Sequence, residues 1–245
     1  MKISLVTVVY NAQDTIAKCI KSVVSQKHPD IEYIVIDGGS TDNTVQIINQ
    51  YRSSISFFVS EPDSGIYDAM NKGIKMATGQ IVGTLNADDY LADDEVLSAV
   101  AQAFTQDDAD AVYGNLNMVN HSGKITRKWN SKQCRPNSFN RGFMPPHATF
   151  YCKRSLFEKL GFYSLEYGSA GDYELLVRFM HLHKIKSRFI NKLMVIMLTG
   201  GVSNRNFKNR LNAWKHDFKA MRKNNIRFPV LALALKPTRK LYQLF

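Results

Sequence analysis

The chain has 245 residues, of which 44% are hydrophobic and 22% are charged. This composition predicts a folded globular protein with one sizeable core and excludes an intrinsically disordered chain. The formal net charge is +11, from 32 Lys and Arg residues against 21 Asp and Glu residues.

The first hundred residues alternate strand-like and helix-like segments. Runs of β-branched and apolar residues predict strands covered on both faces. The strands are expected at Ile3–Val9, Ile31–Ile36, Ile55–Val59 and Gln80–Leu85, and the helices at Thr15–Ser25, Thr41–Tyr51, Ile66–Ala77 and Asp93–Phe104. Ser40 or Thr41 is expected to cap the second helix. Four strand–helix units in succession predict an α/β fold with a largely parallel, doubly wound sheet.

The pattern changes after residue 110. Strands are predicted at Ala111–Tyr113, Leu116–Val119, Gly123–Trp129, Lys186–Asn191 and Leu193–Leu198, and helices at Arg154–Leu160 and Gly171–Leu182. A long helix over Phe207–Arg222 is predicted by an apolar stripe of Leu211, Trp214, Phe218 and Met221. Pro229 is expected to end it, with a short apolar and basic tail beyond.

The positive charge is concentrated at the C-terminal end. From Arg205 onward there are eleven Lys or Arg residues and one acid, Asp217, which leaves 21 basic against 20 acidic residues in the rest of the chain. A DNA-binding domain would usually spread its charge over a reading surface, and no nucleic-acid motif is present. We therefore predict that the tail contacts an anionic partner other than nucleic acid.

Three cysteines (Cys19, Cys134 and Cys152) have no metal-type spacing and form no disulfide framework. Cys19 falls on a predicted apolar helix face and is expected to be a buried thiol. The chain enters a strand almost at its first residue, with no cleavable signal pattern, and Val230–Leu235 is too short to span a bilayer. These features predict a cytoplasmic protein that is not integral to a membrane.

Polar clusters follow four of the predicted strands. They are Tyr10–Asn11, Asp37–Ser40, Glu61–Asp63 and Asn86–Asp89. In an open parallel sheet, ligands bind beyond the carboxyl ends of the strands. One such cluster could be an ordinary turn, but four at the same edge favour a binding crevice.

The cluster Asn86–Asp89 directly follows an apolar strand. Its oxygen atoms suit Mg²⁺ or Mn²⁺ bridging a diphosphate, with Asp88 and Asp89 as ligands. The alternative is that Asp88 and Asp89 cap the helix predicted to begin near Asp93. Neither G-x-G-x-x-G nor G-x-x-x-x-G-K-[ST] occurs, which argues against a Rossmann dehydrogenase and a P-loop protein.

Four motifs carry a family resemblance: Ser4–Asn11, Val35–Thr44, Ser60–Gly73 and Leu85–Asp89. In order and spacing they resemble the family 2 glycosyltransferases, in particular bacterial exopolysaccharide enzymes of the colanic-acid type. The resemblance runs to about residue 203. It implies a GT-A catalytic domain over 1–203, with a nucleotide-binding half (1–110) and an acceptor-side half (111–203). Residues 204–245 then form a basic amphipathic helical tail.

The resemblance also implies a function. The family transfers a sugar with inversion from a nucleotide-sugar donor to an acceptor hydroxyl, using a divalent metal. Uridine diphosphate is the favoured carrier, because the Asp37 carboxylate can accept the imide N–H of uracil. The acceptor implied is a glycan or a polyprenyl-diphosphate-linked sugar at the inner face of the cell membrane.

The same resemblance assigns residues to roles. Thr7, Tyr10 and Asn11 would line the nucleoside pocket, with Asp37 at the base. Asp63 and Asn71 would lie near the ribose and sugar. Asp88, together with Asp89, would be the metal ligand of the family's D-x-D element, and Asn86 stands where the element usually has its first carboxylate. All of these positions are read from the sequence.

Inverting transfer needs a general base for the acceptor hydroxyl. In the family this carboxylate begins a helix and is often preceded by Glu. Here Asp172 occupies that position after Gly171, and Glu174 is the alternative. Asp172 could instead be an acid that only interacts with the helix dipole. Arg178 is expected to be a structural partner.

Two loops and the tail remain open to two interpretations each. His147 either contacts the donor phosphates, the metal or the acceptor, or takes no part. Gly200–Gly201 lies either in a lid over the diphosphate or in a plain connector. The basic helix either packs on the catalytic domain or docks on an anionic membrane surface.

Two other functions compete with glycosyl transfer. A nucleotidyltransferase would normally have a Gly- and Lys/Arg-rich loop after its first strand, and Tyr10–Gln13 is unlike that. A catalytically idle sugar-nucleotide-binding or scaffold subunit remains the alternative, because Asn86 and Gly171 depart from the family's pattern.

Overall fold

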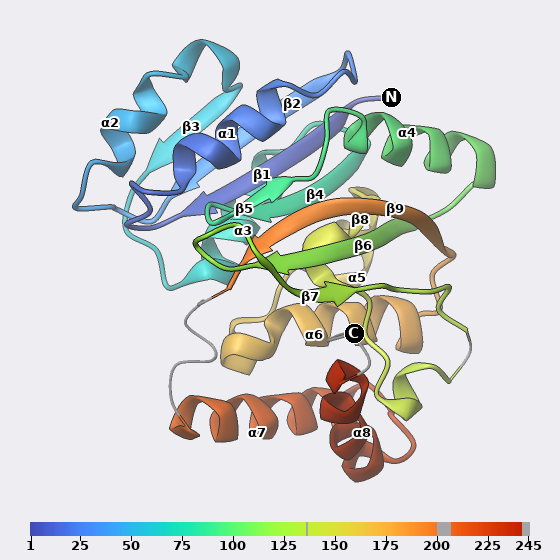
Figure 1. Cartoon of the computed structure of the whole chain (residues 1–245). Coiled ribbons are helices and arrows are strands. Elements are labelled where there is room, and N and C mark those ends of the chain that lie inside the picture. Colours follow the sequence, from blue (N-terminus) through green and yellow to red (C-terminus); the bar gives the residue numbers. More distant parts are fainter. Residues whose placement is uncertain (136, 200–206, 242–245) are drawn as a thin grey trace.

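The computed structural model describes residues 1–135, 137–199 and 207–241. One mixed sheet lies between two helical layers (Figure 1). The strand order along the sheet is β3-β2-β1-β4-β8-β6-β9-β5. The remaining strand, β7, pairs with the C-terminal residues of β6, from Leu116 to Val119.

The N-terminal half of the sheet is entirely parallel, as predicted. Its strands are β1 (Ile3–Val9), β2 (Ile31–Asp37), β3 (Phe57–Ser60) and β4 (Ile81–Asn86). Every residue of β1 is buried, because helices cover both faces of this strand. Val6 and Val8 point to one helical layer, while Ile3, Leu5 and Val9 point to the other.

Helices α1 (Ile16–Val24), α2 (Thr44–Asn49) and α4 (Val96–Asp107) bury side chains in the same core cluster on one face. Helix α3 (Ile66–Met76) contributes to the cluster on the opposite face. The predicted cap of α2 is wrong, because the helix begins later and Asn43 holds the N-cap position. Ser40 is instead bonded to Asp37.

The second half of the sheet mixes strand directions. Its strands are β5 (Asp89–Leu91), β6 (Ala111–Val119), β7 (Ile125–Trp129), β8 (Tyr151–Lys153) and β9 (Ser187–Leu198). The two strands predicted within β6 are one, and so are the two within β9, because the interruptions are register shifts in the β6–β9 pairing. The short strand β5 was not predicted; it pairs with the end of β9.

Short helices complete the second half. They are η1 (Arg52–Ser54), η2 (Phe139–Arg141), η3 (His147–Thr149), α5 (Ser155–Leu160), η4 (Leu165–Ala170) and α6 (Gly171–Leu176). The segment η5 (Val177–Leu182) continues α6 as a π-helix. The predicted helix over 171–182 is therefore present, with a change of hydrogen-bonding pattern at its middle.

The C-terminal segment forms two helices, α7 (Phe207–Lys223) and α8 (Pro229–Leu241). The prediction that Pro229 is followed only by a short tail is wrong. Proline is tolerated at the first position of a helix, where its missing N–H has no partner to lose. Ala220, Met221 and Ala232 are fully buried in the same core cluster as α3 and α6, so both helices pack on the body of the protein.

The predicted apolar stripe of α7 is only partly buried. Met221 is fully buried, whereas Trp214 is 48% exposed and Phe218 lies between the two. The side chain of Leu211 lies outside the described part of the chain. No described helix has the length and hydropathy needed to cross a membrane. Cys19 is buried as a free thiol, as predicted.

Candidate functional site

The carboxyl ends of the parallel strands meet at one rim of the sheet. In the register of the sheet, Val9 at the end of β1 lies beside Asp37 at the end of β2, and Asp37 lies beside Ser60 at the end of β3. On the other side of β1, Val8 lies beside Asn86 at the end of β4. The four predicted polar clusters therefore start from the same rim.

Asp37 shapes the turn that follows β2. Its carboxylate is fully buried and accepts hydrogen bonds from the backbone N–H groups of Gly39 and Ser40, at 3.2 and 3.0 Å. The hydroxyls of Ser40 and Ser60 also donate to it. Four donors from the protein hold this carboxylate, so it fixes the conformation of the loop at the centre of the rim.

Asn11 ties the loop after β1 to the loop after β2. Its backbone has φ of +47°, a left-handed conformation that Asn tolerates better than most residues. The Asn11 N–H donates to Ser40 Oγ at 2.8 Å, and Asn11 Oδ1 accepts from the Thr41 N–H at 2.8 Å. The neighbouring Tyr10 side chain is 62% exposed, which leaves an aromatic ring open at the rim.

Asp63 lies against the backbone of Gly38. A Cβ atom at position 38 would collide with Asp63 Oδ2, so a side chain there would displace the Asp63 carboxylate. Asp63 Oδ1 accepts the Gly65 N–H at 2.7 Å, which fixes the carboxylate over the loop. Asp63 was predicted from the sequence, whereas the role of Gly38 was not; its only signal was its place directly after Asp37.

The structure does not bring Thr7 into the crevice. Thr7 is fully buried, and its hydroxyl accepts a hydrogen bond from the Tyr33 hydroxyl at 3.1 Å and lies 3.8 Å from Cys19 Sγ. Odd positions of β1 face α1, so Thr7 belongs to the layer beneath the rim. Its predicted place in the lining of a nucleoside pocket stays a prediction.

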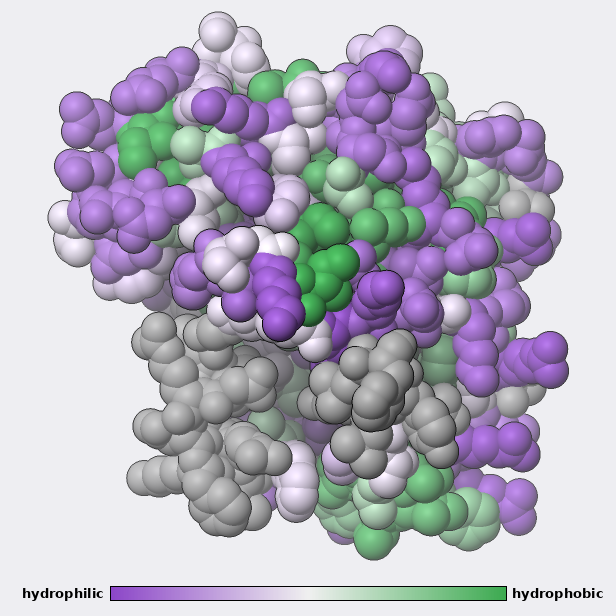
Figure 2. All heavy atoms as spheres, in the orientation of Figure 1, coloured by the Kyte–Doolittle hydropathy of each residue, from purple (hydrophilic) through white to green (hydrophobic). Residues whose placement is uncertain are grey.

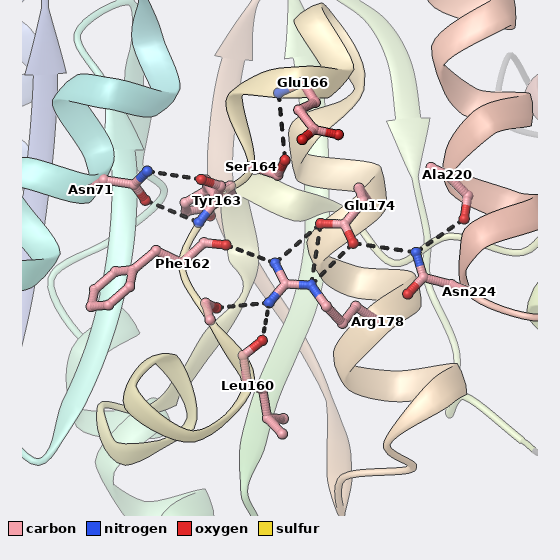
Figure 3. Close-up of polar contacts among 11 residues, drawn as sticks. Asn71, Leu160, Phe162, Tyr163, Ser164, Glu166, Glu174, Arg178, Ala220 and Asn224 are labelled. Carbon is pink, nitrogen blue, oxygen red and sulfur yellow. Dashed lines mark hydrogen bonds and ion pairs between the residues drawn. The ribbon is translucent and has the colours of Figure 1, made fainter.

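Asn71 is likewise committed elsewhere. Its Nδ2 donates to the Tyr163 carbonyl at 2.8 Å, and its Oδ1 accepts from the Tyr163 N–H at 2.9 Å (Figure 3). This pair of bonds joins α3 to the segment between α5 and η4 and uses both ends of the amide. Asn71 therefore has a structural role here, and its predicted position near the ribose and sugar stays a prediction.

Asn86 and Asp89 carry buried oxygen atoms that lack partners. Asp89 is 1% exposed, and its Oδ1, like Asn86 Oδ1, makes no hydrogen bond. Asn86 Nδ2 lies 3.5 Å from Asp89 Oδ2, which is a long contact. Burial and then the charge of Asp88 raise the pKa of Asp89 well above its usual range, and burial raises the pKa of Asp88.

This arrangement fits a divalent cation. Unpartnered buried oxygens beside two carboxyl groups are costly unless a cation or proton compensates them. No group of three His, Cys, Asp or Glu residues in the described ranges forms a complete metal cage. A Mg²⁺ or Mn²⁺ ion held here would need oxygens from a phosphate and water as well. The alternative that Asp88 and Asp89 cap the next helix is wrong, because α4 begins only at Val96.

Asp172 lies near the start of α6 and meets two residues from distant segments. The Tyr67 hydroxyl donates to Asp172 Oδ1 at 3.2 Å. His147 Nδ1 lies 3.0 Å from Asp172 Oδ2, although the ring N–H is not oriented for a hydrogen bond. The side chain of Asp172 remains 18% exposed and that of His147 30% exposed. The structure therefore brings together Asp172 and His147, both predicted from the sequence.

Tyr67 was not predicted to belong to the site. It lies in the first turn of α3, next to the rim where β3 ends, and its hydrogen bond brings Asp172 to that rim. Its ring stacks on Tyr163 with centroids 5.4 Å apart. Burial, followed by the charge of Asp172, raises the pKa of the Tyr67 hydroxyl well above its usual range, so the hydroxyl keeps its proton.

Glu174 is not available as a base. It is 3% exposed, and both of its carboxylate oxygens accept from Arg178 at 3.0 to 3.3 Å (Figure 3). Asn224, in the turn directly after α7, also donates to it at 3.2 Å. The Arg178 guanidinium further donates to the carbonyls of Leu160, Gly161 and Phe162. Arg178 is thus a structural partner, as predicted, and the network fixes the helix that carries Asp172.

The segment Gly200–Gly201, predicted as a lid or a connector, lies outside the described residues.

The chain is similar to known glycosyltransferases. A PGL/p-HBAD biosynthesis glycosyltransferase of Mycobacterium bovis is 28% identical over 206 residues, which cover 82% of this chain and 78% of that protein. S. aureus TarS 1–349, solved in complex with UDP, superposes with a TM-score of 0.72 at 19% identity, over 99% of this chain and 72% of that chain.

Two further structures share the architecture. The mannosyltransferase PcManGT from Pyrobaculum calidifontis, in complex with GDP-Man and Mn²⁺, gives a TM-score of 0.65 at 18% identity, over 96% of this chain and 68% of that chain. A longer TarS structure gives 0.70 at 21% identity, and there this chain spans 39% of the length. The fold is the GT-A fold that the sequence predicted.

The sequence match is more specific than the fold. Residues 4–166, which include the four strand-end clusters and Tyr67, match the sequence model of Glycosyl transferase family 2. The chain therefore belongs to family 2 of the glycosyltransferases.

Proposed function

We propose that this glycosyltransferase moves a sugar with inversion from a nucleoside-diphosphate sugar to an acceptor hydroxyl, with a divalent metal. The observation that carries the proposal is that the same rim of the sheet holds two clusters of acidic and amide side chains. One is the half-buried Asp172, held by Tyr67, and the other is Asn86 with Asp88 and Asp89. An inverting transfer needs both a base and a cation for the leaving diphosphate.

The donor nucleotide belongs at the ends of β1, β2 and β3. Tyr10 offers an exposed ring for stacking, and Asn11 and Asp37 hold the loops that would face the base. Asp63, fixed over Gly38, is placed to accept a hydroxyl of the ribose. UDP stays the proposed carrier; TarS has been solved with UDP and UDP-GlcNAc, and PcManGT with GDP-Man.

Asp88 is proposed as the main metal ligand. It is partly exposed, whereas Asp89 is buried behind it, and Asn86 contributes an amide oxygen that has no other partner. Mg²⁺ or Mn²⁺ held here would neutralise the charge that develops on the departing diphosphate. Asp89, which is buried, would add its negative charge to the attraction of the site for the cation.

Asp172 is proposed as the general base. The acceptor oxygen forms a bond to the anomeric carbon while the bond from that carbon to the diphosphate oxygen breaks, and the hydroxyl proton passes to the Asp172 carboxylate. Tyr67 orients this carboxylate through its hydrogen bond to Oδ1. A well-placed base contributes about 10²–10⁴-fold to the rate. His147 lies beside Oδ2, where it can contact the acceptor or the donor phosphates.

The acceptor is proposed to be a glycan or a polyprenyl-diphosphate-linked sugar in bacterial surface-polysaccharide synthesis, at the cytoplasmic face of a membrane. Eleven basic residues from Arg205 onward, against one acid, support contact with an anionic surface there.

The test measures donor turnover with Mn²⁺ and with a chelator. We expect Mn²⁺-dependent hydrolysis of the donor by the wild type, loss of it in Asp88→Ala, and about 10²–10⁴-fold slower turnover with retained nucleotide binding in Asp172→Asn. Asp94→Ala, on an exposed acid of a surface ion pair, is the matched control and should behave as wild type.

Three outcomes would overturn parts of this proposal. Turnover that is insensitive to chelation contradicts the metal. A product that retains the donor's anomeric configuration contradicts inversion. Nucleotide binding with no turnover of any donor favours the alternative of an idle sugar-nucleotide-binding or scaffold subunit. A thermal-shift comparison of UDP and GDP with Mn²⁺ identifies the carrier, because a ligand that binds only the native state raises its stability.

A further inference from the structure

The outward face of α8 is apolar. Val230 is 70% exposed, and Leu231 and the preceding Phe228 are each 53% exposed. Ala234 and Pro237 are also exposed and continue the same helical face. In Figure 2, hydrophobic residues gather at the lower edge of the molecule, over α8. We call Phe228, Val230, Leu231 and Ala234 the α8 patch.

The inward face of α8 carries a charged side chain, that of Lys236. Lys236 Nζ lies 2.6 Å from Asp217 Oδ2 of α7 and 3.5 Å from the ring centroid of Tyr173, and its side chain is only 16% exposed. Ala232 is fully buried, and its carbonyl oxygen would lie 2.7 Å from a Cβ at Gly142. Surface helices usually turn their charges to water and their apolar side to the core. In α8, Ala232 and Leu233 pack on the core beside the inward Lys236, and a second apolar face is left exposed to water.

The residues around the α8 patch are basic. Arg222, Lys223 and Arg227 are exposed, and the Arg227 guanidinium lies 5.3 Å from the Phe228 ring centroid. The sequence from residue 218 to 241 contains no Asp or Glu. An exposed apolar surface bordered by basic residues is complementary to a partner whose apolar interior lies beneath a layer of anionic groups.

We propose that the α8 patch docks on an anionic lipid bilayer, with Phe228, Val230 and Leu231 among the acyl chains and Arg222 and Arg227 at the headgroups. This inference deepens the membrane part of the proposed function and rests on it. It places the contact on α8 and the turn before it, not on the predicted stripe of α7, whose Met221 faces the core. A second copy docked by twofold symmetry is disfavoured, because it would bring the arginines of both copies together.

The test is co-sedimentation of the full chain with vesicles of phosphatidylcholine and phosphatidylglycerol, compared with phosphatidylcholine alone. We expect binding to the anionic vesicles and about a tenfold or larger loss of it in the double variant Val230→Ser, Leu231→Ser, since buried aliphatic area sets such partitioning. The matched control is Val24→Ser, Ile125→Ser, which removes two aliphatic side chains of 43% and 44% exposure elsewhere and should bind as wild type. Arg222→Gln, Arg227→Gln should reduce the preference for phosphatidylglycerol.

Several results would overturn the docking proposal. They are absence of binding to either vesicle, equal binding to both, or an equal loss in the control pair. A change of sedimentation coefficient without a change of vesicle binding in Val230→Ser, Leu231→Ser would assign the patch to a protein contact. Donor hydrolysis measured without vesicles reports on glycosyl transfer separately, and retained hydrolysis shows that the double variant is folded.

Discussion

The hydroxyl of Tyr67 donates a hydrogen bond to Asp172 Oδ1 across 3.2 Å, joining two residues that lie 105 positions apart in the chain. The Tyr67 ring also fills the space beside Gly171, where a Cβ atom would lie 2.8 Å from Cε2. Gly171 directly precedes Asp172 at the start of α6. Here the aromatic ring of α3 takes that space, and its hydroxyl orients the aspartate.

Removing that hydroxyl tests its role. Tyr67→Phe keeps the ring against Gly171 and Tyr163 and deletes only the donor to Asp172. We expect kcat to fall between about tenfold and about a hundredfold, the range for a hydrogen bond to a charged group, with little change in the KM for the donor. Steady-state kinetics measure this split. Tyr113→Phe removes a hydroxyl of another buried tyrosine, which donates to the Lys132 carbonyl and accepts the Cys134 N–H; an equal fall of kcat there would contradict the assignment.

Gly171 and Tyr67 should be coupled in stability. Gly171→Ala adds a methyl group against the Tyr67 ring, and overpacking of this kind costs about 1–3 kcal/mol. In a Tyr67→Ala background the space is open, so the same change should cost much less. Urea unfolding of the wild type, both single variants and the double variant gives the coupling energy. Additive effects would show that the ring does not limit position 171.

Asn86→Asp tests the cation site by adding a carboxylate, whereas Asp88→Ala removes one. A third carboxyl group beside Asp88 and Asp89 raises like-charge repulsion without a cation and adds a ligand when one is bound. We expect a lower Tm than wild type in a chelator and a larger rise of Tm on adding Mn²⁺. Asn49→Asp, on the exposed end of α2, makes the same chemical change away from the rim. A response to Mn²⁺ equal to that of wild type would argue against a cation at Asn86.

The buried network of Figure 3 should contribute strongly to stability. Glu174→Ala leaves the Arg178 guanidinium, 14% exposed, without its carboxylate, and breaking a buried pair costs about 3–5 kcal/mol. The pair Arg154 and Glu158 has the same spacing on a helix but is 40% and 54% exposed. Glu158→Ala should cost less than about 1 kcal/mol. Chemical denaturation measures both, and similar losses would contradict the role given to the network.

Glu32 should make stability depend on acid pH. Burial by itself raises the pKa of this carboxyl group, but hydrogen bonds from Lys2, Ser4 and Thr78 outweigh it and lower the pKa to about 2. In the unfolded chain the pKa of Glu is about 4.3. The stabilisation is therefore complete above about pH 4.3 and is lost as the pH falls towards about 2.

Glu32→Gln removes this titration. The variant should be less stable than wild type at neutral pH, and the difference should shrink as the pH falls through that window. Urea unfolding at a series of pH values measures it, with Glu95→Gln, a change in an exposed pair with Lys27, as the control. A difference in stability that stays constant with pH would contradict the expected linkage.

The sequence alone determined the parallel half of the sheet and the rim where the site lies. The spacing of apolar residues and the presence of β-branched residues predict strands and helices locally. The carboxyl ends of parallel strands must then meet at one edge of the sheet. The positions of Asp37, Asp63 and Asp88 followed from motifs placed at those ends, and that of Asp172 from the family resemblance. Within the four parallel strands and their helices, only the ends of elements shifted, as where Ser40 bonds to Asp37 instead of capping α2.

The tertiary structure alone decided which side chains are free to act. Thr7, Asn71 and Glu174 lie in or near the predicted motifs, yet each is committed to a partner inside the protein: Tyr33, Tyr163 and Arg178. The orientation of α8, with Lys236 inward and Val230 outward, was also not predicted. A local pattern encodes which segment is a strand or helix, whereas a hydrogen bond across a hundred residues depends on how the segments pack.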